Sequence, residues 1–266
     1  MIEVKDICKT FQLSKEALKN SKKNVLDVRQ DGREFHALRG VSFSCAQGEV
    51  LGLLGPNGAG KTTILRILAS ALKPTSGDIT IAGESVITKP EISKQKIGFL
   101  SGKTGLYNRL TARENIEYFA RLHGMSKQRI RDVGEQLYAQ LGIEPYLERR
   151  VETLSTGMTQ KVSIARAVIH QPEVIIFDEP TTGLDIMATE VILEFIDAQK
   201  EQGVSVIFST HHLDEVGMLA DKVTVINDGT TRFSGTLSQF TSQSNESDLR
   251  KAFKHFLSSD EVAVCG

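Results

Sequence analysis

Gly55-Pro56-Asn57-Gly58-Ala59-Gly60-Lys61-Thr62 is the stretch of sequence that decides the fold. It follows the apolar run 50–54, which has the length and composition of a buried strand, and it opens a helical pattern at 62–72. Glycines let such a turn wrap closely around a phosphate chain with its N–H groups pointing inward, and the amino end of the helix adds positive potential. This order of strand, turn, Lys-Thr pair and helix predicts a P-loop that binds a nucleoside triphosphate.

Each position of this loop has an expected task. The backbone of Gly55, Pro56, Asn57, Gly58, Ala59 and Gly60 is expected to form the cradle for the phosphates. Lys61 is expected to reach the β- and γ-phosphates, and Thr62 to give its hydroxyl to Mg²⁺. Thr63 adds a hydrogen bond to a phosphate oxygen. A glycine-rich turn that binds nothing is the alternative, and it leaves the Lys-Thr pair and both flanking elements unexplained.

Two acidic residues follow a second apolar run. Asp178 and Glu179 come directly after the Val-Ile-Ile-Phe of residues 174–177, at the carboxyl end of a predicted buried strand, where open α/β sheets bind their ligands. Asp178 is expected to hold the Mg²⁺ shell, and Glu179 to polarise the water that attacks the γ-phosphate. Two solvated acids at a strand end are the alternative, which the P-loop elsewhere in the chain disfavours.

Composition and charge narrow the classes of protein. The 266 residues are 40% hydrophobic, enough to bury the core of one large α/β domain or of two small ones. The net charge of −1 creates no field that would recruit an anionic bilayer or nucleic acid, so we expect no nucleic acid partner. Cys8, Cys45 and Cys265 form no CxxC pair, which argues against a disulfide framework and a zinc site. Charged or turn residues interrupt every apolar stretch before ~18 residues, so no segment is expected to span a membrane.

Short apolar runs alternate with helical patterns along most of the chain. The runs have the composition of strands buried on both faces, and they comprise residues 50–54, 174–177, 204–208 and 223–226. Helical periodicity is clearest in residues 62–72 and 187–199. Strands that alternate with helices predict an α/β fold with a mainly parallel sheet, as the core of a P-loop NTPase.

Other regions depart from this alternation. Three stretches read as strands joined by turns and predict an antiparallel β subdomain, namely residues 2–11, 38–45 and 77–82. Residues 111–148 open with a capping box at Thr111 and predict an inserted helical subdomain. The basic segment 14–36 is expected to be a solvated loop or an extended hairpin, with a lipid headgroup or partner contact as the alternative. Residues 249–257 predict a short terminal helix.

Residues 154–158, Leu-Ser-Thr-Gly-Met, and the Thr-Gln-Lys-Val-Ser-Ile-Ala-Arg-Ala that follows them separate this chain from other P-loop proteins. Ser155 and Gly157 at a predicted helix start form a second anion site, remote from the P-loop in sequence. This pattern resembles the signature of the ABC ATP-binding cassettes, and the resemblance covers residues 1–237. It implies ATP as the nucleotide and a head-to-tail homodimer, in which each ATP lies between one subunit's P-loop and its partner's signature.

The resemblance assigns roles to three more residues. Asp185 follows Pro-Thr-Thr-Gly-Leu and matches the D-loop, which crosses the dimer interface, and a helix N-cap is a compatible second role. His211 follows Ser-Thr at a predicted strand end and matches the switch histidine, which contacts the γ-phosphate and orients the water with Glu179. Phe11 matches the aromatic A-loop position that stacks on adenine, although a phenylalanine at a strand end is also an ordinary core residue. Lys61, Glu179 and His211 are therefore the expected catalytic residues.

The sequence departs from the family pattern after residues 96–100. The family places a glutamine there, in the Q-loop that reports to the membrane subunit, whereas this chain has Ser101-Gly102-Lys103, and its Gln95 precedes the strand. Ser101 replaces that glutamine only in part. The LSTGM form of the signature resembles exporters of the ABC-2 class, and residues 97–124 together with the basic segment resemble the sodium-extruding NatA family.

The resemblance predicts an ATP-binding and ATP-hydrolysing subunit at the cytoplasmic face of the membrane, where an ABC-2 permease subunit is its partner and sodium the first candidate cargo. Residues 1–237 are expected to form the ATP-binding domain, with a helical subdomain at about 105–160, and residues 238–266 a tail with a short helix. Three alternatives are open: an exporter of drugs, other small molecules or lipids, a soluble ATPase that acts on ribosomes or DNA, and a binder that does not hydrolyse. The second usually carries two cassettes or a coiled coil, which this chain lacks, and the third has no need of Glu179 and His211.

Overall fold

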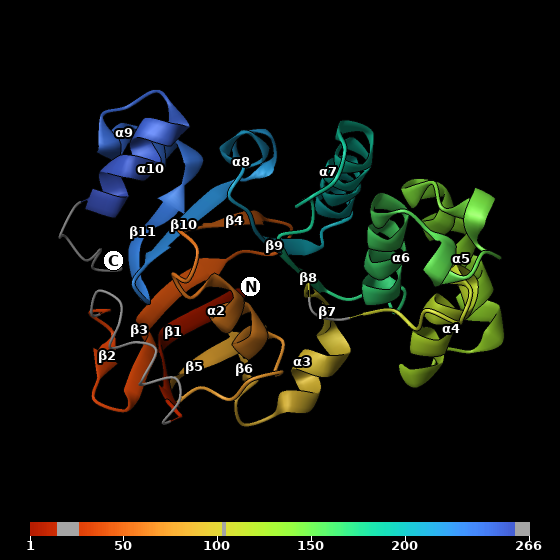
Figure 1. Cartoon of the computed structure of the whole chain (residues 1–266), viewed down its shortest axis with the longest axis horizontal. Coiled ribbons are helices and arrows are strands. Elements are labelled where there is room, and N and C mark those ends of the chain that lie inside the picture. The colour runs from red at the N-terminus through yellow and green to blue at the C-terminus, as the bar shows by residue number, and fades with distance from the viewer. Residues whose placement is uncertain (15–26, 103–104, 259–266) are drawn as a thin grey trace.

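Two β-sheets organise the computed structural model, which describes residues 1–14, 27–102 and 105–258 (Figure 1). The strands within these residues are β1 (Ile2–Gln12), β2 (Gln30–Asp31), β3 (Glu34–Cys45), β4 (Val50–Leu54), β5 (Ser76–Ile81), β6 (Glu84–Ser85), β7 (Ile97–Leu100), β8 (Val174–Asp178), β9 (Ser205–Ser209), β10 (Lys222–Asn227) and β11 (Thr230–Thr236). The larger sheet has the order β11-β10-β4-β9-β8-β7, and the smaller sheet has the order β2-β3-β1-β5-β6. The predicted combination of a mainly parallel sheet with an antiparallel β subdomain is confirmed.

Helices connect and cover the strands. Those of the described residues are α2 (Lys61–Leu68), α3 (Pro90–Lys96), α4 (Ala112–Leu122), α5 (Lys127–Leu141), α6 (Thr156–Val168), α7 (Ile186–Glu201), α8 (Leu213–Leu219), α9 (Leu237–Ser244) and α10 (Leu249–Ser258). Two single turns of 3₁₀ helix, Glu144–Tyr146 and Val151–Thr153, lie between α5 and α6. No helix within the ranges that the structure describes is long and apolar enough to cross a membrane.

The larger sheet is buried on both of its faces. Five neighbouring strands, from β10 to β7 in the order of the sheet, run parallel, and β11 pairs antiparallel with β10 at one edge. Along β4, Leu51 and Leu53 belong to one apolar cluster, while Val50 and Leu54 belong to the other. A continuous apolar run is what strands covered on both faces require. Because β4, β8 and β9 are parallel, their carboxyl ends meet at one edge of the sheet.

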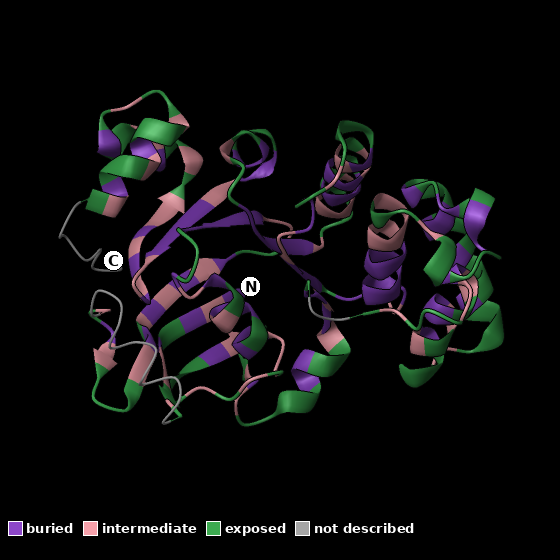
Figure 2. Ribbon diagram, viewed as in Figure 1, coloured by how far each residue is buried: buried purple, intermediate pink, exposed green. Residues whose placement is uncertain are grey.

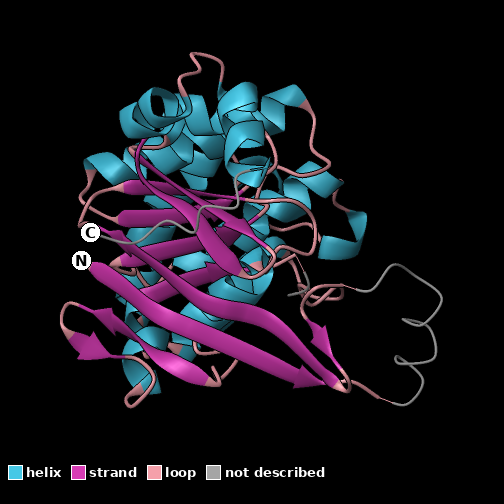
Figure 3. Ribbon diagram, turned by 90° about the vertical axis from the view of Figure 1, so that its left-hand side faces the viewer, coloured by secondary structure: helices cyan, strands magenta, loops and turns pink. Residues whose placement is uncertain are grey.

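Different helices cover the two faces. On one side, α2 lies between the two sheets, and its Ile64 and Leu68 share an apolar cluster with Ile2 and Val4 of β1. On the other side, the apolar cluster is completed by α7, α8, the segment α4–α6 and the two C-terminal helices. Figure 3 shows the antiparallel strands as a separate layer, away from most of the helices. This packing fixes α2 against the larger sheet, close to β4, the strand that precedes it in the chain.

The long strands β1 and β3 form the spine of the antiparallel sheet. They pair from Ile2 opposite Cys45 to Gln12 opposite Glu34, with register shifts in between, and Phe11 stands opposite Phe35. β2 continues the sheet as a short hairpin with β3. The end of the basic segment 14–36 is therefore a hairpin, one of the two forms expected. The rest of that segment, residues 15–26, lies outside the described residues, as do Lys103 and Cys265.

Helices α4 and α5 lie at one end of the molecule, in the stretch where a helical insertion was predicted, and α6 packs between them and β7 (Figure 1). The capping box at the start of α4 is confirmed: the Thr111 hydroxyl accepts a hydrogen bond from the Glu114 N–H at 3.1 Å, and Glu114 Oε2 accepts one from the Thr111 N–H at 2.8 Å. Gly142 ends α5 in the left-handed conformation with φ 60°. Local sequence signals therefore set the start of α4 and the end of α5.

Several elements differ from the sequence predictions. The helix expected at 62–72 ends at Leu68, because Ser70 takes a left-handed conformation with φ 53°. The strand expected at 38–45 begins at Glu34, where pairing with β1 extends it. The elements α3, α8, α9 and β11 were not predicted, because each is short or lacks a clear apolar period.

Two helices, α9 and α10, form the carboxyl end where one was expected. Phe240 of α9 and Phe256 of α10 pack on Phe233 of β11, with ring centroids 5.2 and 4.7 Å from that of Phe233. All three rings are buried, and Figure 2 shows buried positions on both helices. The aromatic contact anchors both helices on the edge of the larger sheet.

Candidate nucleotide-binding site

The P-loop runs from the end of β4 to the first turn of α2. At Gly55 any side chain is excluded, because a Cβ atom there would lie 2.2 Å from the carbonyl oxygen of Ile226. At Gly58 the backbone is left-handed with φ 81°, and a Cβ atom would meet nothing within 4 Å, so this position borders open space. The loop is therefore packed against the sheet at its start and open at its centre.

The ammonium group of Lys61 is hydrogen-bonded to the first residues of this loop. The side chain is 6% exposed, and its Nζ donates hydrogen bonds to the carbonyl oxygens of Gly55 at 2.7 Å and Pro56 at 3.2 Å. Burial lowers the pKa of Lys61, and the negative charges of Glu179 and Asp178 oppose that shift. The first turn of α2 contains no acidic residue. A buried cation at an unneutralised helix amino end is a strong site for phosphate.

Two cavities flank the loop and share Asn57 and Glu179. One, of about 430 Å³, is lined by Leu54, Gly55, Pro56, Asn57, Glu179, Thr182, Thr210, His211, Leu213 and Phe253. The other, of about 210 Å³, is lined by Phe11, Phe35, Ala37, Asn57, Gly58, Gly60, Lys61, Thr62, Thr63 and Glu179. The structure thus brings together the P-loop, the acidic Glu179, His211 and Phe11, as the sequence predicted. Phe35 and Phe253 were not predicted, and Phe253 brings the terminal helix α10 to the cleft.

The acidic pair is held by Ser209 of the neighbouring strand. Asp178 stands opposite Ser209 in the β8–β9 register, and the Ser209 hydroxyl donates a hydrogen bond to Asp178 Oδ1 at 2.8 Å. The Glu179 N–H donates to the Ser209 carbonyl at 3.1 Å and lies 3.0 Å from its hydroxyl oxygen. Glu179 itself has a left-handed backbone with φ 53°. The Asp178 carboxylate is thus bound to β9, while the chain leaves β8 in a left-handed conformation at Glu179.

Glu179 and His211 lie next to each other in the lining of the larger cavity. Glu179 Oε2 accepts a hydrogen bond from the Thr182 hydroxyl at 3.1 Å, and it lies 3.7 Å from His211 Nδ1. The Glu179 side chain is 31% exposed and that of His211 is 49% exposed. Both groups are therefore accessible to a water molecule and to a phosphate. His212 follows with its ring 4.1 Å from that of His211, but it does not line the cavity.

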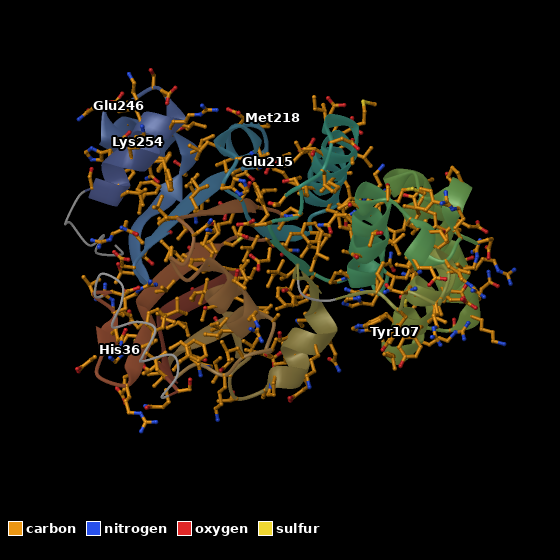
Figure 4. All side chains as sticks on the ribbon, in the orientation of Figure 1. His36, Tyr107, Glu215, Met218, Glu246 and Lys254 are labelled. Carbon is orange, nitrogen blue, oxygen red and sulfur yellow. The ribbon has the colours of Figure 1, made fainter. Side chains whose placement is uncertain are left out.

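Glu215 joins the segments that carry these two residues. It is 7% exposed, and its carboxylate accepts one hydrogen bond from the Thr181 hydroxyl and one from the Thr210 hydroxyl, each at 2.7 Å. Thr181 lies two residues after Glu179, and Thr210 directly precedes His211. Glu215 is part of α8, and Figure 4 shows it below Met218, an exposed residue of the same helix. The sequence pattern contained Glu215 but gave no sign that it connects the two segments.

The predicted second anion site lies at the amino end of α6, separate from these cavities. The Ser155 hydroxyl caps the helix by accepting a hydrogen bond from the Met158 N–H at 3.3 Å, and the first turn contains no acidic residue. A Cβ atom on Gly157 would lie 3.1 Å from that of Ala188. Neither Ser155 nor Gly157 lines a cavity with the P-loop. A contact links the two regions nevertheless, since Gln160 Nε2 donates to the Pro180 carbonyl at 2.6 Å.

Asp185 and Ser101 complete the predicted set. Asp185 caps α7, its carboxylate accepting a hydrogen bond from the Ala188 N–H at 2.8 Å, so the expected N-cap is present. Ser101 is 8% exposed and follows β7, in which Leu100 pairs with Phe177, the residue before Asp178. Gln95 lies exposed on α3, before β7, as the sequence indicated. The residue directly after β7 is thus a serine and not a glutamine.

The residues present fit a nucleotide with a bound Mg²⁺. Thr62 is exposed beside the cavity, and Asp178 keeps a carboxylate oxygen that receives no hydrogen bond in the described structure. The described residues contain no group of three or more His, Cys, Asp or Glu side chains that could hold a metal by themselves. An ion that takes most of its ligands from phosphate oxygens and water needs only one carboxylate and one hydroxyl. Thr62 has such a hydroxyl and Asp178 such a carboxylate, so these are the residues that would hold it.

The arrangement defines a P-loop ATP-binding cassette with a separate signature site. The sequence model of the family described as "ABC transporter" matches residues 38–182. The ABC transporter ATP-binding protein NatA of Bacillus subtilis is 45% identical over 82% of this chain and 89% of its own length. The linearmycin resistance ATP-binding protein LnrL of Bacillus subtilis is 34% identical over 77% of this chain, which spans 66% of that longer relative.

A solved structure shows the same architecture. The dimeric ATP-binding cassette MJ0796, in a post-hydrolysis state bound to ADP and Pi, superposes with a TM-score of 0.75. It is 26% identical and covers 89% of this chain and 99% of its own. The chain therefore belongs to the ABC transporter family and is the ATP-binding subunit of such a transporter.

Proposed function

We propose that this subunit hydrolyses ATP to ADP and phosphate and drives export through a separate membrane subunit. The observation that carries the proposal is the pair of cavities beside the P-loop: Glu179 lines both of them, His211 lines the larger one and Lys61 the smaller one. A protein that only stores nucleotide needs the P-loop but has no use for a carboxylate placed to activate water. The family membership supports ATP as the nucleotide.

Each of these residues has a separate task in the proposed reaction. The loop N–H groups and Lys61 bind the β- and γ-phosphates and offset the charge that shifts toward the leaving oxygen. Glu179 orients the attacking water and takes up its proton, while the new bond from water oxygen to phosphorus forms and the bond to the bridging oxygen breaks. His211 hydrogen-bonds the γ-phosphate and keeps Glu179 aligned. Mg²⁺ between Thr62 and Asp178 would neutralise charge on the phosphate oxygens.

A second copy of the chain completes each site in this proposal. The amino end of α6 with Ser155 and Gly157 is an exposed anion site that does not reach the chain's own P-loop. A head-to-tail homodimer would place it on the γ-phosphate held by the partner copy. Asp185 would lie at the same interface, followed by Ile186 and Met187, which are 76% and 72% exposed. The dimeric state of MJ0796 supports this arrangement.

The partner in the membrane is proposed to be a permease of the ABC-2 type, which holds the subunit at the cytoplasmic face. The LSTGM signature and the similarity to NatA support this class. Sodium is the first cargo to test, on the resemblance to the sodium-extruding NatA family. A drug or another small molecule is the second, because LnrL is named for linearmycin resistance. Co-reconstitution with the permease in vesicles, with ATPase activity and ²²Na⁺ flux measured together, would distinguish the two.

Replacement of Glu179 by Gln tests the catalytic assignment. The amide keeps the shape of the side chain but cannot accept the proton, so the variant is expected to bind ATP with wild-type affinity, to accumulate as an ATP-bound dimer and to release phosphate at least about 100-fold more slowly. Phosphate release and size-exclusion chromatography with ATP measure these effects. Glu190→Gln, an exposed glutamate on α7, is the matched control. Unchanged phosphate release in Glu179→Gln would refute the role of Glu179.

A further inference from the structure

The outer side of the P-loop is in contact with a buried arginine that no motif predicted. Arg29 is 8% exposed and lies just before β2. Its Nη1 donates a hydrogen bond to the carbonyl oxygen of Gly58 at 2.6 Å. Gly58 is the central glycine of the loop, so a positive charge from the antiparallel sheet acts directly on the phosphate cradle.

Asp27 fixes the direction of this guanidinium group. Arg29 Nε donates to Asp27 Oδ1 at 2.9 Å, and Arg29 Nη2 donates to Asp27 Oδ2 at 2.6 Å. The Arg29 backbone N–H also donates to Asp27 Oδ1, at 3.0 Å. The hydrogen bonds from Arg29 lower the pKa of Asp27, and those to Asp27 raise the pKa of Arg29. A forked pair of this kind restricts the guanidinium to one orientation, which leaves Nη1 free to reach Gly58.

The surrounding hairpin holds Arg29 over the wall of the cleft. Its guanidinium carbon lies 4.8 Å from the centre of the Phe35 ring, and Phe35 lines the same cavity as Thr62 and Thr63. The Arg29 carbonyl accepts a hydrogen bond from the His36 N–H at 2.9 Å, and His36 Nδ1 lies 3.1 Å from the hydroxyl of Thr10 (Figure 4). The arginine is therefore fixed through its backbone as well as its side chain.

The peptide group between Gly58 and Ala59 follows a glycine at which a Cβ atom would meet nothing within 4 Å. Gly58 has no side chain and no neighbour in its way, so its backbone can change conformation at little steric cost. A carbonyl oxygen turned toward the phosphates would repel them. In the structure both ends of this peptide group are held, the carbonyl by Arg29 and the Ala59 N–H by the Pro56 carbonyl at 3.1 Å. The next carbonyl, of Ala59, accepts from the Gly229 N–H at 3.0 Å.

We propose that Arg29, oriented by Asp27, is a positioning residue for nucleotide binding: it holds the Gly58 carbonyl outward, so that the loop N–H groups face the phosphates before ATP arrives. The proposal rests on the proposed function, since it concerns the same ATP site. It adds a determinant of ATP affinity that lies outside the P-loop motif. The preorganised loop lowers the free energy needed to order it around the nucleotide.

The test compares Arg29→Ala, Arg29→Lys and Arg33→Ala in the full chain. Loss of one charge-assisted hydrogen bond predicts that Arg29→Ala weakens Mg-ATP binding about tenfold and raises KM for ATP by a similar factor, while kcat at saturating ATP stays within about twofold. Arg29→Lys retains the charge and recovers part of the affinity. Arg33, exposed in the turn of the same hairpin, is the control and should leave both values unchanged. Titration calorimetry gives the affinity, and phosphate release gives kcat and KM.

A purely structural role would give a different pattern. Wild-type affinity and KM in Arg29→Ala, with only the melting temperature lowered, would overturn the proposal. If Arg29→Ala does not fold, Asp27→Asn removes the orienting carboxylate charge and leaves the arginine in place, and it is expected to weaken ATP binding by about threefold to tenfold. An unchanged affinity in Asp27→Asn would then overturn the role of Asp27. Failure of the proposed function itself is recognised separately, because wild-type protein would then show no ATP turnover.

Discussion

The amino ends of α2 and α6 are the two proposed phosphate sites of this chain, and they differ in what surrounds them. At α2 the loop is packed against the sheet, Lys61 is buried beneath it, and cavities open on both sides. At α6 the cap is a single exposed serine, Ser155, with neither a lysine nor a cavity shared with the P-loop. Neither first turn carries an acidic residue. The helix dipole is thus available at both ends, but only α2 is part of an enclosed site.

This difference between the two helix ends fits the proposed dimer, in which the two sites have different tasks. A site that must hold nucleotide by itself needs a charge and a fitted loop in addition to the helix dipole, which alone contributes ~1 kcal/mol or less at an exposed end. A site that only closes on a phosphate already held by another subunit can be weak and exposed. Substitutions at the amino end of α2 should therefore change the affinity for ATP. Substitutions at the amino end of α6 should change how turnover depends on dimer formation.

The largest effect is expected from Lys61→Ala. The change removes charge-assisted hydrogen bonds to the phosphates, each contributing about 1.5–3 kcal/mol, so ATP affinity should fall by at least about 100-fold. Arg66→Ala removes an exposed cation from the same helix and should leave affinity unchanged. Titration calorimetry with Mg-ATP measures both. Tight binding in the Lys61→Ala variant would remove the distinction between the two helix ends.

A smaller effect, confined to turnover, is expected from Ser155→Ala. ATP binding to the single chain should not change, whereas phosphate release should fall about tenfold as the contact to the partner's phosphate is lost. Ser126 caps α5 in the same manner, its hydroxyl accepting from the Arg129 N–H at 3.2 Å. Ser126→Ala should therefore cost a similar ~1 kcal/mol of stability, with full activity. Equal activity losses in the two variants would mean that Ser155 acts only as a cap.

Glu215→Ala tests the connection between the Glu179 and His211 segments. It leaves the buried hydroxyls of Thr181 and Thr210 without their acceptor, so the free energy of unfolding should fall by about 2–3 kcal/mol, and kcat about fivefold, with KM for ATP nearly constant. Urea unfolding and steady-state kinetics give these values. Asp214→Ala, exposed in the same turn, is the control. A rise in KM with unchanged kcat would show that Glu215 acts on ATP binding instead.

The smallest effect on activity is expected from a fall in pH. This change should destabilise the region around α6 before the rest of the chain. His170, just after α6, stacks on His123 of the α4 end with ring centroids 3.8 Å apart. Burial lowers the pKa of His170 from 6.5 to about 4. Below pH 6.5 the unfolded chain therefore binds a proton that the folded chain does not, so stability declines as pH falls from about 6.5 toward 4.

The loss should amount to about 2 kcal/mol at pH 5. Thermal unfolding of wild type, His170→Gln and His255→Gln between pH 7.5 and 5 measures it. His170→Gln should flatten the pH dependence, whereas His255, an exposed residue of α10, should not matter. Hydrogen exchange should show α4 and α6 opening before α2. An unaltered pH profile in His170→Gln would contradict this assignment.

Much of the fold followed from short-range sequence signals. The apolar runs, the P-loop glycines and the capping box at Thr111 each specify a local structure through steric or hydrogen-bonding rules that act within a few residues. The parallel order of β4, β8 and β9 then brings the P-loop, Glu179 and His211 to one edge. Those residues could therefore be placed in one site before any coordinates were known.

Contacts between distant segments could not be predicted in the same way. Arg29 and Gly58 are 29 residues apart, and Glu215 and Thr181 are 34 apart, and no local rule relates them. Phe253 reaches the cleft only because aromatic packing fixes α10 on β11. Such contacts depend on tertiary packing, and a single sequence does not show which distant residues the packing brings together. The missing Q-loop glutamine was visible in sequence, but the burial of Ser101 was not.

The left-handed backbone at Glu179 affects which amino acids are favoured at this position during evolution. A residue with a Cβ atom in that conformation costs of order 1 kcal/mol or more, whereas glycine and asparagine adopt it readily. Stability alone would therefore favour Gly or Asn at this position, and in the proposed mechanism the need for a carboxylate is what keeps Glu there. A duplicated copy released from selection for hydrolysis should drift toward those residues and gain stability as it loses turnover. The amino acid at this position in a homologue would then record whether its lineage still hydrolyses ATP.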